Sequence, residues 1–208
     1  MLEQKKSSQI FMINFLNNNR EVPFSLFRKK YLKAVKSKEH LPYAVNISSV
    51  SGDGTVDSRF VNLKIVDNED FIFFTNYNSP KSKQFHNNNQ ISACFFWKTT
   101  NTQIRIKAKI IKSDKLTNET YFSSRDIKKN ALAISSRQSN IISSYDLVKD
   151  NYNKALTRTD LKTCPEYWGG FTFTPHEIEF WEGDKFRLNK RNLYKKQNDK
   201  WVHFILEP

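Results

Sequence analysis

The residues best suited to chemistry lie near the end of the chain, where an aromatic stretch leads into two arginines. Ile178–Trp181 is followed by Arg187 and Arg191, which are four residues apart. Aromatic faces stack on planar rings, and guanidinium groups bind phosphates and carboxylates through paired hydrogen bonds. This order suits a planar, anionic ligand. On composition alone, however, Trp168 and Trp181 are better explained as core residues than as stacking groups.

Other cations lie on or beside expected strands. Arg59 and Lys64 share one strand, where a separation of five residues places them on opposite faces unless a bulge intervenes. Ser79 and Lys81 flank the first residue of an expected helix, and a helix N-terminus with a nearby lysine can bind phosphate. The simpler alternative for Arg59 and Lys64 is that both side chains are solvated. For Ser79 and Lys81 it is a helix cap that binds no ligand.

A second anion pocket is indicated by one helix face. Tyr121 and Arg125 are four residues apart, and Lys129 can continue the same face. The alternative is an exposed aromatic–arginine pair. Taken together, the cations predict two groups of anion-binding residues around an aromatic barrel.

Metal and nucleophile motifs are poorly supported. The sequence contains no His-Glu-x-x-His, Gly-x-Ser-x-Gly, Walker or Gly-x-Gly-x-x-Gly pattern. Cys94 and Cys164 form no Cys-x-x-Cys pair, and Cys94 is expected to be a small buried thiol. The four histidines lie far apart in the chain: His40, His86, His176 and His203. No metal site is therefore expected.

The elements that must position these residues are mostly strands. The alternation of apolar and polar residues from Thr102 to Ile110 is typical of a half-exposed antiparallel strand. Further strands are expected over residues 43–50, 56–66, 71–75, 91–97, 171–174, 177–181, 192–196 and 201–206. Helices are expected from about residue 23 to Pro42 and over residues 79–89, 114–124 and 143–157. This order predicts a mainly β, α+β fold, an antiparallel barrel with short helical insertions.

Length and charge limit the class of protein. The chain of 208 residues is long enough for one domain with its own core, expected over residues 23–208, after a polar, flexible extension over residues 1–22. Most of the net charge of +13 comes from residues 1–40 and 183–200, which favours solvated basic ends, with an anion site as the functional alternative. No stretch resembles a membrane span or an export signal, so the cytoplasm is the expected location.

Residues from about 23 to the end of the chain resemble the pyridoxine/pyridoxamine 5′-phosphate oxidase family, FMN enzymes with a split-barrel fold. Each matching stretch is weak alone, but their order and spacing agree over most of the chain. The stretches are Arg59–Lys64, Phe74–Lys81, Gln103–Arg105, Tyr121–Arg125, Arg137–Ser139 and Trp168–Arg191.

The resemblance implies a role for each matching residue. Those implied to bind FMN are Arg59, Val61, Lys64, Phe74, Thr75, Ser79, Lys81, Gln103, Gln138, Ser139, Trp181 and Arg191. Those implied to bind the substrate are Lys64, Tyr121, Arg125, Lys129, Arg187 and Asn189, of which Arg187 and Asn189 form the catalytic end.

The resemblance also implies a reaction and an assembly. A hydride passes from C4′ of pyridoxine or pyridoxamine phosphate to flavin N5, and O2 reoxidises the flavin, giving pyridoxal 5′-phosphate and H2O2. The flavin carries the redox chemistry while the protein orients the donor carbon and balances charge. FMN is expected between the two subunits of a homodimer, with a phosphorylated small molecule as substrate. Neither a membrane nor nucleic acid is an expected partner.

Four positions depart from the family pattern. Asn189 stands where a histidine is usual, Lys129 where a serine is usual and Pro80 where an arginine is usual, while Leu41 replaces an acidic residue. Asparagine can form hydrogen bonds but does not titrate near neutral pH. The flavin site is thus expected to be largely complete and the catalytic end altered.

Three alternatives remain open for the function. One is an FMN oxidase of the same family that acts on another planar substrate, as the dihydrophenazine oxidases do. Another is a flavin-binding or pyridoxal-phosphate-binding protein that has lost turnover. A basic nucleic-acid binder is the third, and it would show strongly salt-dependent affinity.

Overall fold

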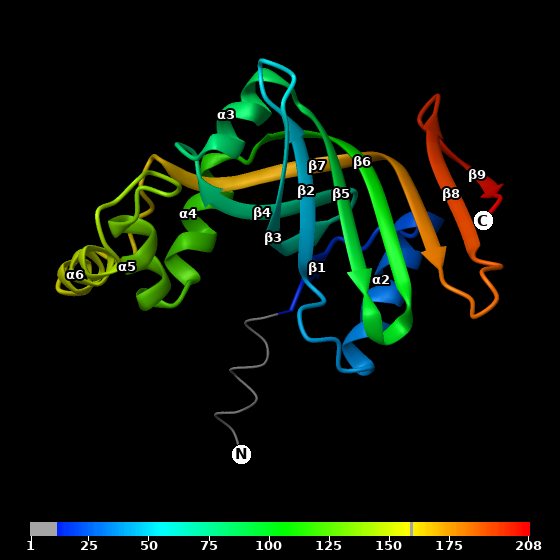
Figure 1. Cartoon of the computed structure of the whole chain (residues 1–208), viewed down its shortest axis with the longest axis horizontal. Coiled ribbons are helices and arrows are strands. Elements are labelled where there is room, and N and C mark those ends of the chain that lie inside the picture. Colours follow the sequence, from blue (N-terminus) through cyan, green and yellow to red (C-terminus); the bar gives the residue numbers. More distant parts are fainter. Residues whose placement is uncertain (1–11, 159) are drawn as a thin grey trace.

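An antiparallel barrel of six strands forms the centre of the computed structural model, which describes residues 12–158 and 160–208. Its strands pair in the order β3-β2-β5-β6-β7-β4, and β4 closes the ring by pairing with β3 (Figure 1). They are β2 (Ala44–Val50), β3 (Val56–Asp67), β4 (Asp70–Asn76), β5 (Gln90–Trp97), β6 (Thr102–Lys112) and β7 (Trp168–Glu182). The predicted antiparallel barrel with helical insertions is confirmed.

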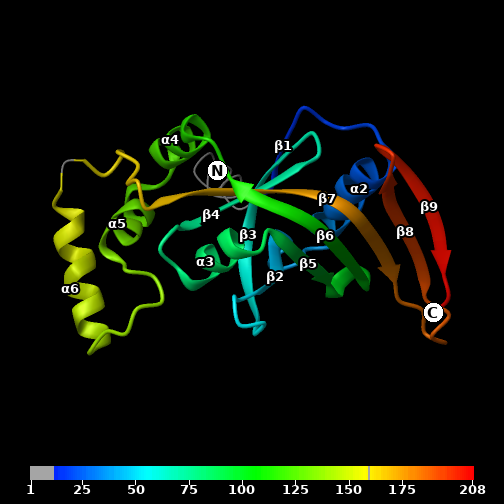
Figure 2. The ribbon, with the colours of Figure 1, turned by 90° about the horizontal axis from the view of Figure 1, so that it is seen from above.

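Strand β7 is longer than the sequence predicts. Two short strands were expected over residues 171–174 and 177–181, whereas the structure has one strand of 15 residues. Pro175 pairs with Ala108 and Glu177 with Lys107, so His176 is an extra residue accommodated as a bulge. The first half of β7 pairs with β4 and the second half with β8 (Lys190–Gln197). Figure 2 shows β7 running across the molecule to the hairpin formed by β8 and β9 (Lys200–Leu206).

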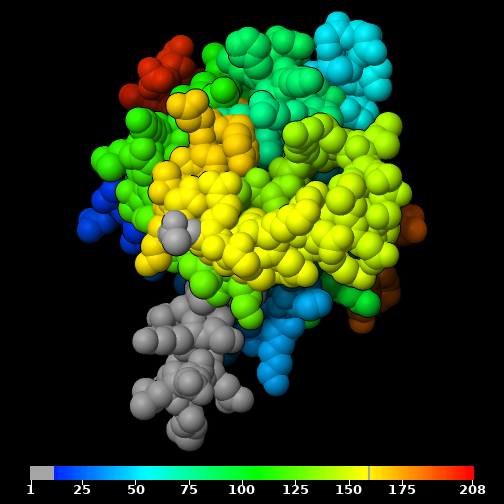
Figure 3. Space-filling view, turned by 90° about the vertical axis from the view of Figure 1, so that its left-hand side faces the viewer, coloured from blue at the N-terminus to red at the C-terminus, as the bar shows by residue number. Residues whose placement is uncertain are grey.

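The helices cover the barrel from two sides (Figure 1). Helix α2 (Val22–Lys36) buries an aromatic face against the core, and Phe27 contacts the rings of Phe71 and Phe95 at centroid distances of 5.0 and 5.3 Å. Helix α3 (Pro80–Asn87) follows β4 directly. The remaining helices, α4 (Lys115–Ser124), α5 (Ile127–Ser135) and α6 (Tyr145–Leu156), lie between β6 and β7 in the chain. In Figure 3, α6 lies across the face that is turned to the viewer. A 3₁₀ turn, η1, spans Lys98–Thr100.

Two details differ from the expected elements. Helix α2 ends at Lys36 rather than near Pro42, because the chain reverses at Lys38, whose φ is 59°. Helix α5 was not expected.

The expected flexible extension also contains structure. Residues 14–16 form β1 (Asn14–Leu16), which pairs in parallel with β3, and the backbone N–H of Ile13 donates to the Tyr31 hydroxyl at 2.9 Å. Ile13 is buried, so this part of the extension belongs to the core. Residues 1–11 lie outside the described residues. No helix among the described residues is long and apolar enough to cross a membrane.

Candidate functional site

A buried lysine lies where β4 passes into α3. Lys81 is 8% exposed, and its Nζ donates to Thr75 Oγ1 at 3.1 Å and to Ser79 Oγ at 3.0 Å. Pro80 occupies the first position of α3, so Ser79 and Lys81 flank the helix N-terminus as predicted. Thr75 Oγ1 in turn donates to Gln138 Oε1 at 3.0 Å. The structure thus brings together four residues predicted to bind FMN.

Arg59 lies close to the same lysine and is held by polar residues. Its guanidinium donates to Ser49 Oγ at 2.6 Å and to Gln84 Oε1 at 2.9 Å. Gln84 Nε2 donates to the carboxylate of Asp57, which lies 3.8 Å from Arg59 Nη2. We call Arg59, Thr75, Ser79 and Lys81, with Ser49 and Gln84, the β4–α3 cluster. Sequence reasoning missed Ser49 and Gln84, because neither occurs in a recognisable motif.

The cations of the β4–α3 cluster are partly or wholly buried. Burial, together with the positive charge of Arg59, lowers the pKa of Lys81 to about 8. Burial also lowers the pKa of the Arg59 guanidinium, although Asp57 acts in the opposite direction. An anion bound at the N-terminus of α3 would offset both effects.

A bulge turns Lys64 toward a different group of residues. Strand β3 pairs Leu63 with Phe73 and Ile65 with Ile72, so Lys64 is the extra residue. The sequence allowed for a bulge between Arg59 and Lys64, and the structure contains one. Lys64 Nζ lies 5.0 Å from the Tyr43 ring centroid. Its pKa is lowered to about 8 by burial and by the charges of Lys129 and Arg125.

Arg125 lies over an aromatic ring and has one buried nitrogen. Its guanidinium lies 4.5 Å from the Trp168 ring centroid, and its Nη2 donates to the backbone oxygen of Lys129 at 3.4 Å. Its Nη1 is buried and has no hydrogen-bond partner among the described residues. Burial lowers the pKa of Arg125. We call Lys64, Tyr121, Arg125 and Lys129 the α4–α5 cluster.

A stack of aromatic rings forms one wall of this cluster. Tyr121 stacks on Phe74 at a centroid distance of 3.8 Å, and Phe74 stacks on Trp168 at 5.4 Å. Burial raises the pKa of Tyr121 to about 12, so the phenol is protonated at neutral pH. Phe74, which belongs to this wall, directly precedes Thr75 of the β4–α3 cluster on β4.

Two glycines allow α4 to approach β7. Asn118 Oδ1 accepts from the Gly170 backbone N–H at 2.7 Å, and its Nδ2 donates to the Tyr77 hydroxyl at 3.0 Å. That hydroxyl donates to the Gly170 carbonyl at 3.0 Å. A Cβ at Gly169 would lie 2.6 Å from Asn118 Nδ2. The Trp-Gly-Gly stretch therefore fixes the helix that carries Tyr121.

A third group lies on the outer face of the barrel. Gln103 on β6 pairs with Trp181 on β7, which pairs with Arg191 on β8. Phe96 on β5 pairs with Gln103, which extends the row to four strands. Directly paired residues project from the same face of a sheet. We call Phe96, Gln103, Trp181 and Arg191 the outer-face row.

The outer-face row and Arg59 lie on opposite faces of the sheet. Arg59 pairs with Ile47, which belongs to a row of buried partners that continues through Ala93 and Ile106. Ile106 and Gln103 are three residues apart on β6, whose burial alternates regularly, so their side chains point in opposite directions. One chain therefore does not bring all the predicted FMN residues around a single cavity. Val61 pairs with Val45 on the inner face.

The predicted catalytic end is a loop between β7 and β8. Arg187 and Leu188 are exposed, and Arg187 has a φ of 67°. Asn189 Oδ1 accepts from the backbone N–H of Asp184 at 3.1 Å, and the Asp184 carbonyl accepts from the Arg187 N–H at 3.1 Å. Asn189 thus helps to close the loop that presents Arg187.

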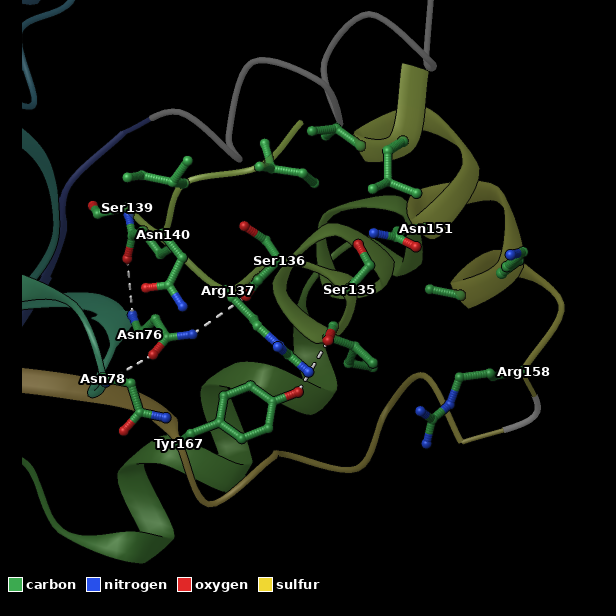
Figure 4. Close-up of a pocket in the computed structure, with 18 residues that line it drawn as sticks. Asn76, Asn78, Ser135, Ser136, Arg137, Ser139, Asn140, Asn151, Arg158 and Tyr167 are labelled. Atoms are coloured by element: carbon green, nitrogen blue, oxygen red, sulfur yellow. Dashed lines mark hydrogen bonds between the residues drawn. The ribbon is translucent and has the colours of Figure 1, made fainter. Parts of the chain in front are cut away.

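The segment with Gln138 and Ser139 borders a cavity. Both residues are exposed, and Gln138 Oε1 also accepts from the Asn76 backbone N–H at 3.3 Å. Asn76 Nδ2 donates to the Ser136 carbonyl at 3.5 Å (Figure 4). The cavity has a volume of about 940 Å³ and continues between α5 and α6. Gln138 therefore links this cavity to the β4–α3 cluster.

One carboxylate in the outer face was not predicted. Glu179 pairs with Arg105 on β6 and forms ion pairs with Arg105 and Arg191. A signal was present, because Glu177 and Glu179 alternate on one expected strand as Arg105 and Lys107 do on another. No group of histidine, cysteine and acidic residues that could hold a metal occurs in the described part of the chain.

Comparisons with known proteins identify the family of this chain. A family profile described as pyridoxamine 5′-phosphate oxidase matches residues 32–158, and one described as the pyridoxine 5′-phosphate oxidase C-terminal dimerisation region matches residues 168–208. The "Pyridoxine/pyridoxamine 5′-phosphate oxidase" of Colwellia psychrerythraea is 36% identical over 189 residues, which cover 89% of this chain and 87% of the relative. The protein of the same name from Haemophilus influenzae is 34% identical over 189 residues, 90% of each chain.

Solved structures show the same fold. PhzG from Burkholderia lata 383, in complex with tetrahydrophenazine-1-carboxylic acid, superposes with a TM-score of 0.86 at 23% identity, over 89% of this chain and 92% of that one. A pyridoxamine 5′-phosphate oxidase-related, FMN binding protein from Nostoc punctiforme superposes with a TM-score of 0.73 at 14% identity, over 88% and 97%. The split-barrel fold expected from the sequence is thereby confirmed. With the two profiles and relatives above 30% identity, the chain belongs to the pyridoxamine 5′-phosphate oxidase family.

Proposed function

We propose that this chain is an FMN-dependent oxidase that converts pyridoxine or pyridoxamine 5′-phosphate to pyridoxal 5′-phosphate. The observation that carries the proposal is the set of buried cations in two neighbouring clusters. Lys81 donates to neutral hydroxyls, and Arg125 has a buried nitrogen that no group in the described part of the chain contacts through a hydrogen bond. Such groups are costly without a bound anion. Two clusters suit a phosphorylated cofactor and a phosphorylated substrate.

The residues of the β4–α3 cluster fit the phosphate of FMN. Lys81 and Arg59 supply positive charge, and the hydroxyls of Thr75 and Ser79 supply hydrogen bonds at the N-terminus of α3. FMN, when bound, supplies the redox chemistry by accepting a hydride and passing electrons to O2. The family relatives and the FMN-binding neighbour from Nostoc support this cofactor.

A second copy of the chain would complete the flavin site. Because Gln103, Trp181 and Arg191 lie on the outer face, we expect them to meet a cofactor held by another subunit. The match of residues 168–208 to a dimerisation region supports a homodimer. We therefore assign the flavin ring to the interface, with the outer-face row of the partner subunit against it.

The α4–α5 cluster would bind the substrate phosphate. Arg125 offers its unpaired Nη1, and Lys64 and Lys129 add positive charge. Phe74 and Tyr121 provide a flat apolar wall beside these cations. Arg187, on its loop between β7 and β8, would approach the substrate ring and orient the donor carbon.

A second candidate is an FMN oxidase for another planar substrate, such as a dihydrophenazine. Asn189 favours it, because its amide oxygen already accepts from the backbone N–H of Asp184. In addition, the side chain does not titrate near neutral pH, as a histidine would. The buried Nη1 of Arg125, which has no hydrogen-bond partner among the described residues, favours the first candidate.

Anaerobic reduction of the bound flavin tests the proposal. We expect the purified chain to be yellow with equimolar FMN, and pyridoxine or pyridoxamine phosphate to bleach the flavin. Bleaching by a dihydrophenazine alone would select the second candidate, and a flavin that no substrate reduces would indicate a non-catalytic binding protein. A purified chain that does not bind FMN would refute the proposal.

Arg125→Ala should raise KM for a phosphorylated substrate by about 100-fold, with little effect on KM for an unphosphorylated analogue.

A further inference from the structure

A buried carboxylate lies at the centre of the outer face. Glu179 is 7% exposed at its side chain and bridges two arginines from the strands on either side. Its Oε1 accepts from Arg191 Nε at 2.8 Å, and its Oε2 accepts from Arg105 Nη1 at 3.0 Å. Glu179 and Trp181 are two residues apart on β7, so they share the face that carries the outer-face row.

Two contacts fix the orientation of Arg191. Glu179 holds its Nε, and the Glu207 carbonyl accepts from its Nη1 at 2.9 Å. The Nη2 end takes part in neither contact. A guanidinium is planar, so fixing two of its nitrogens also fixes the direction of the third. Arg191 is therefore presented with one defined edge available to a ligand.

We propose that Glu179 is a positioning residue for the flavin site, which sets the guanidinium of Arg191 against FMN through its ion pair. The inference rests on the proposed function, because it assumes that Arg191 meets FMN. Glu179 itself touches no ligand in this scheme. It acts by holding Arg191 in one orientation and by offsetting part of the positive charge of two neighbouring arginines.

The same strand offers a matched control. Glu177 lies two residues before Glu179 on the same face, and it also bridges a cation of β6 to a cation of β8. Its carboxylate lies 3.1 Å from Lys107 Nζ and 3.1 Å from Lys195 Nζ. Neither lysine is among the predicted flavin residues. Replacing Glu177 thus removes a similar bridge without disturbing Arg191.

The inference is tested by titrating the full-length apo protein with FMN and measuring binding through the quenching of flavin fluorescence. Glu179→Gln should raise the Kd for FMN about tenfold. Glu177→Gln should leave the Kd within about twofold of the parent chain. In an Arg191→Ala background, Glu179→Gln should cause no further loss, because the residue it positions is gone. Thermal unfolding of each apo variant separates these effects from lost stability.

Glu179→Asp is a second variant for the case that the glutamine variant does not fold. It keeps the buried charge, but its shorter side chain cannot reach both arginines, so it too should weaken FMN binding. Unchanged FMN affinity in a folded Glu179 variant would overturn the inference, as would equal losses in the Glu177 and Glu179 variants. A parent chain that binds no FMN would overturn the proposed function as well.

Discussion

At the scale of single residues, the pKa of Lys81 links charge to cofactor binding. Its ammonium is buried beside Arg59 and bonded to two neutral hydroxyls, and its pKa is lowered to about 8. Below this value Lys81 carries a positive charge, and above it the charge is lost. A bound phosphate stabilises the charged form, so FMN affinity should fall as the pH rises through the pKa.

The expected size of this effect follows from the titration of one group. Between about pH 7 and about pH 9 the Kd for FMN should rise about tenfold, because most Lys81 side chains become neutral. Equilibrium titration with FMN across this range measures the change. Lys81→Arg should flatten the profile, since an arginine stays charged at pH 9.

Lys64 provides the control for this prediction. Its pKa is also lowered to about 8, but its charge lies with Arg125 and Lys129. Lys64→Arg should therefore leave the pH dependence of FMN binding in place. A flat profile in the parent chain, or one abolished by Lys64→Arg, would contradict the assignment of Lys81 to the cofactor phosphate.

Residue types and spacing in the sequence predicted most of the cations of the candidate site, but not the polar residues that contact them. Ser79 and Lys81 follow from the pattern of a helix start, and Arg125 follows from its spacing to Tyr121. Ser49 and Gln84 could not be found this way, because their contacts with Arg59 depend on how β2 and α3 meet in space. Such contacts between distant segments leave no local pattern.

At the scale of elements, the position of α4 depends on its close approach to β7. Gly169→Ala would drive a Cβ into Tyr77 and Asn118, which tie the helix to the strand. We expect a loss of about 2–3 kcal/mol in the free energy of unfolding. Substrate affinity should fall too, since α4 carries Tyr121.

Gly52→Ala is the control variant for Gly169→Ala. A Cβ there would meet only Asn87 Nδ2, at 3.6 Å, which is ordinary contact. Gly52→Ala should therefore stay within about 0.5 kcal/mol of the parent chain. Urea unfolding of the two variants measures the difference. Similar stabilities would show that α4 can move away from β7 without cost.

The elements that the sequence failed to predict are those formed by tertiary contacts. Helix α5 has only nine residues, and its buried Ala131 packs with Ala155 of α6 and with Leu161. A helix this short gains most of its stability from packing. Strand β1 has three residues and exists through its pairing with β3. Strand β7 appeared as two strands because its bulge at His176 interrupts the alternation.

At the scale of the whole molecule, the barrel separates the predicted flavin residues onto two faces. Arg59 projects inward, while Gln103, Trp181 and Arg191 project outward. Sequence patterns cannot reveal this separation, because it depends on strand register and on closure of the barrel. Two chains would bring the two sets together if the outer-face row of one packed against the β4–α3 cluster of the other.

Apolar side chains on the outer face support such packing. Phe96 belongs to the outer-face row and is 57% exposed. Phe60, next to Arg59 in the chain, is 73% exposed. It pairs with Asn46 on β2, which pairs with Cys94 on β5. Large exposed aromatic residues that are continuous with a site are typical of interfaces. The matched dimerisation region contributes Trp181 and Arg191 to the same face.

A charge on this face should therefore separate the subunits and release the cofactor together. Phe60→Glu should weaken the dimer by about 100-fold, because a carboxylate would be buried in an apolar contact. FMN affinity should fall in parallel, although Phe60 points away from the β4–α3 cluster. Light scattering during size-exclusion chromatography gives the assembly state, and flavin absorbance of the eluted peak gives the FMN content. Tyr145→Glu is the control, since this 87% exposed residue begins α6, away from the paired rows of the outer face. A monomeric Phe60→Glu protein that keeps its FMN would show that one chain holds the flavin by itself.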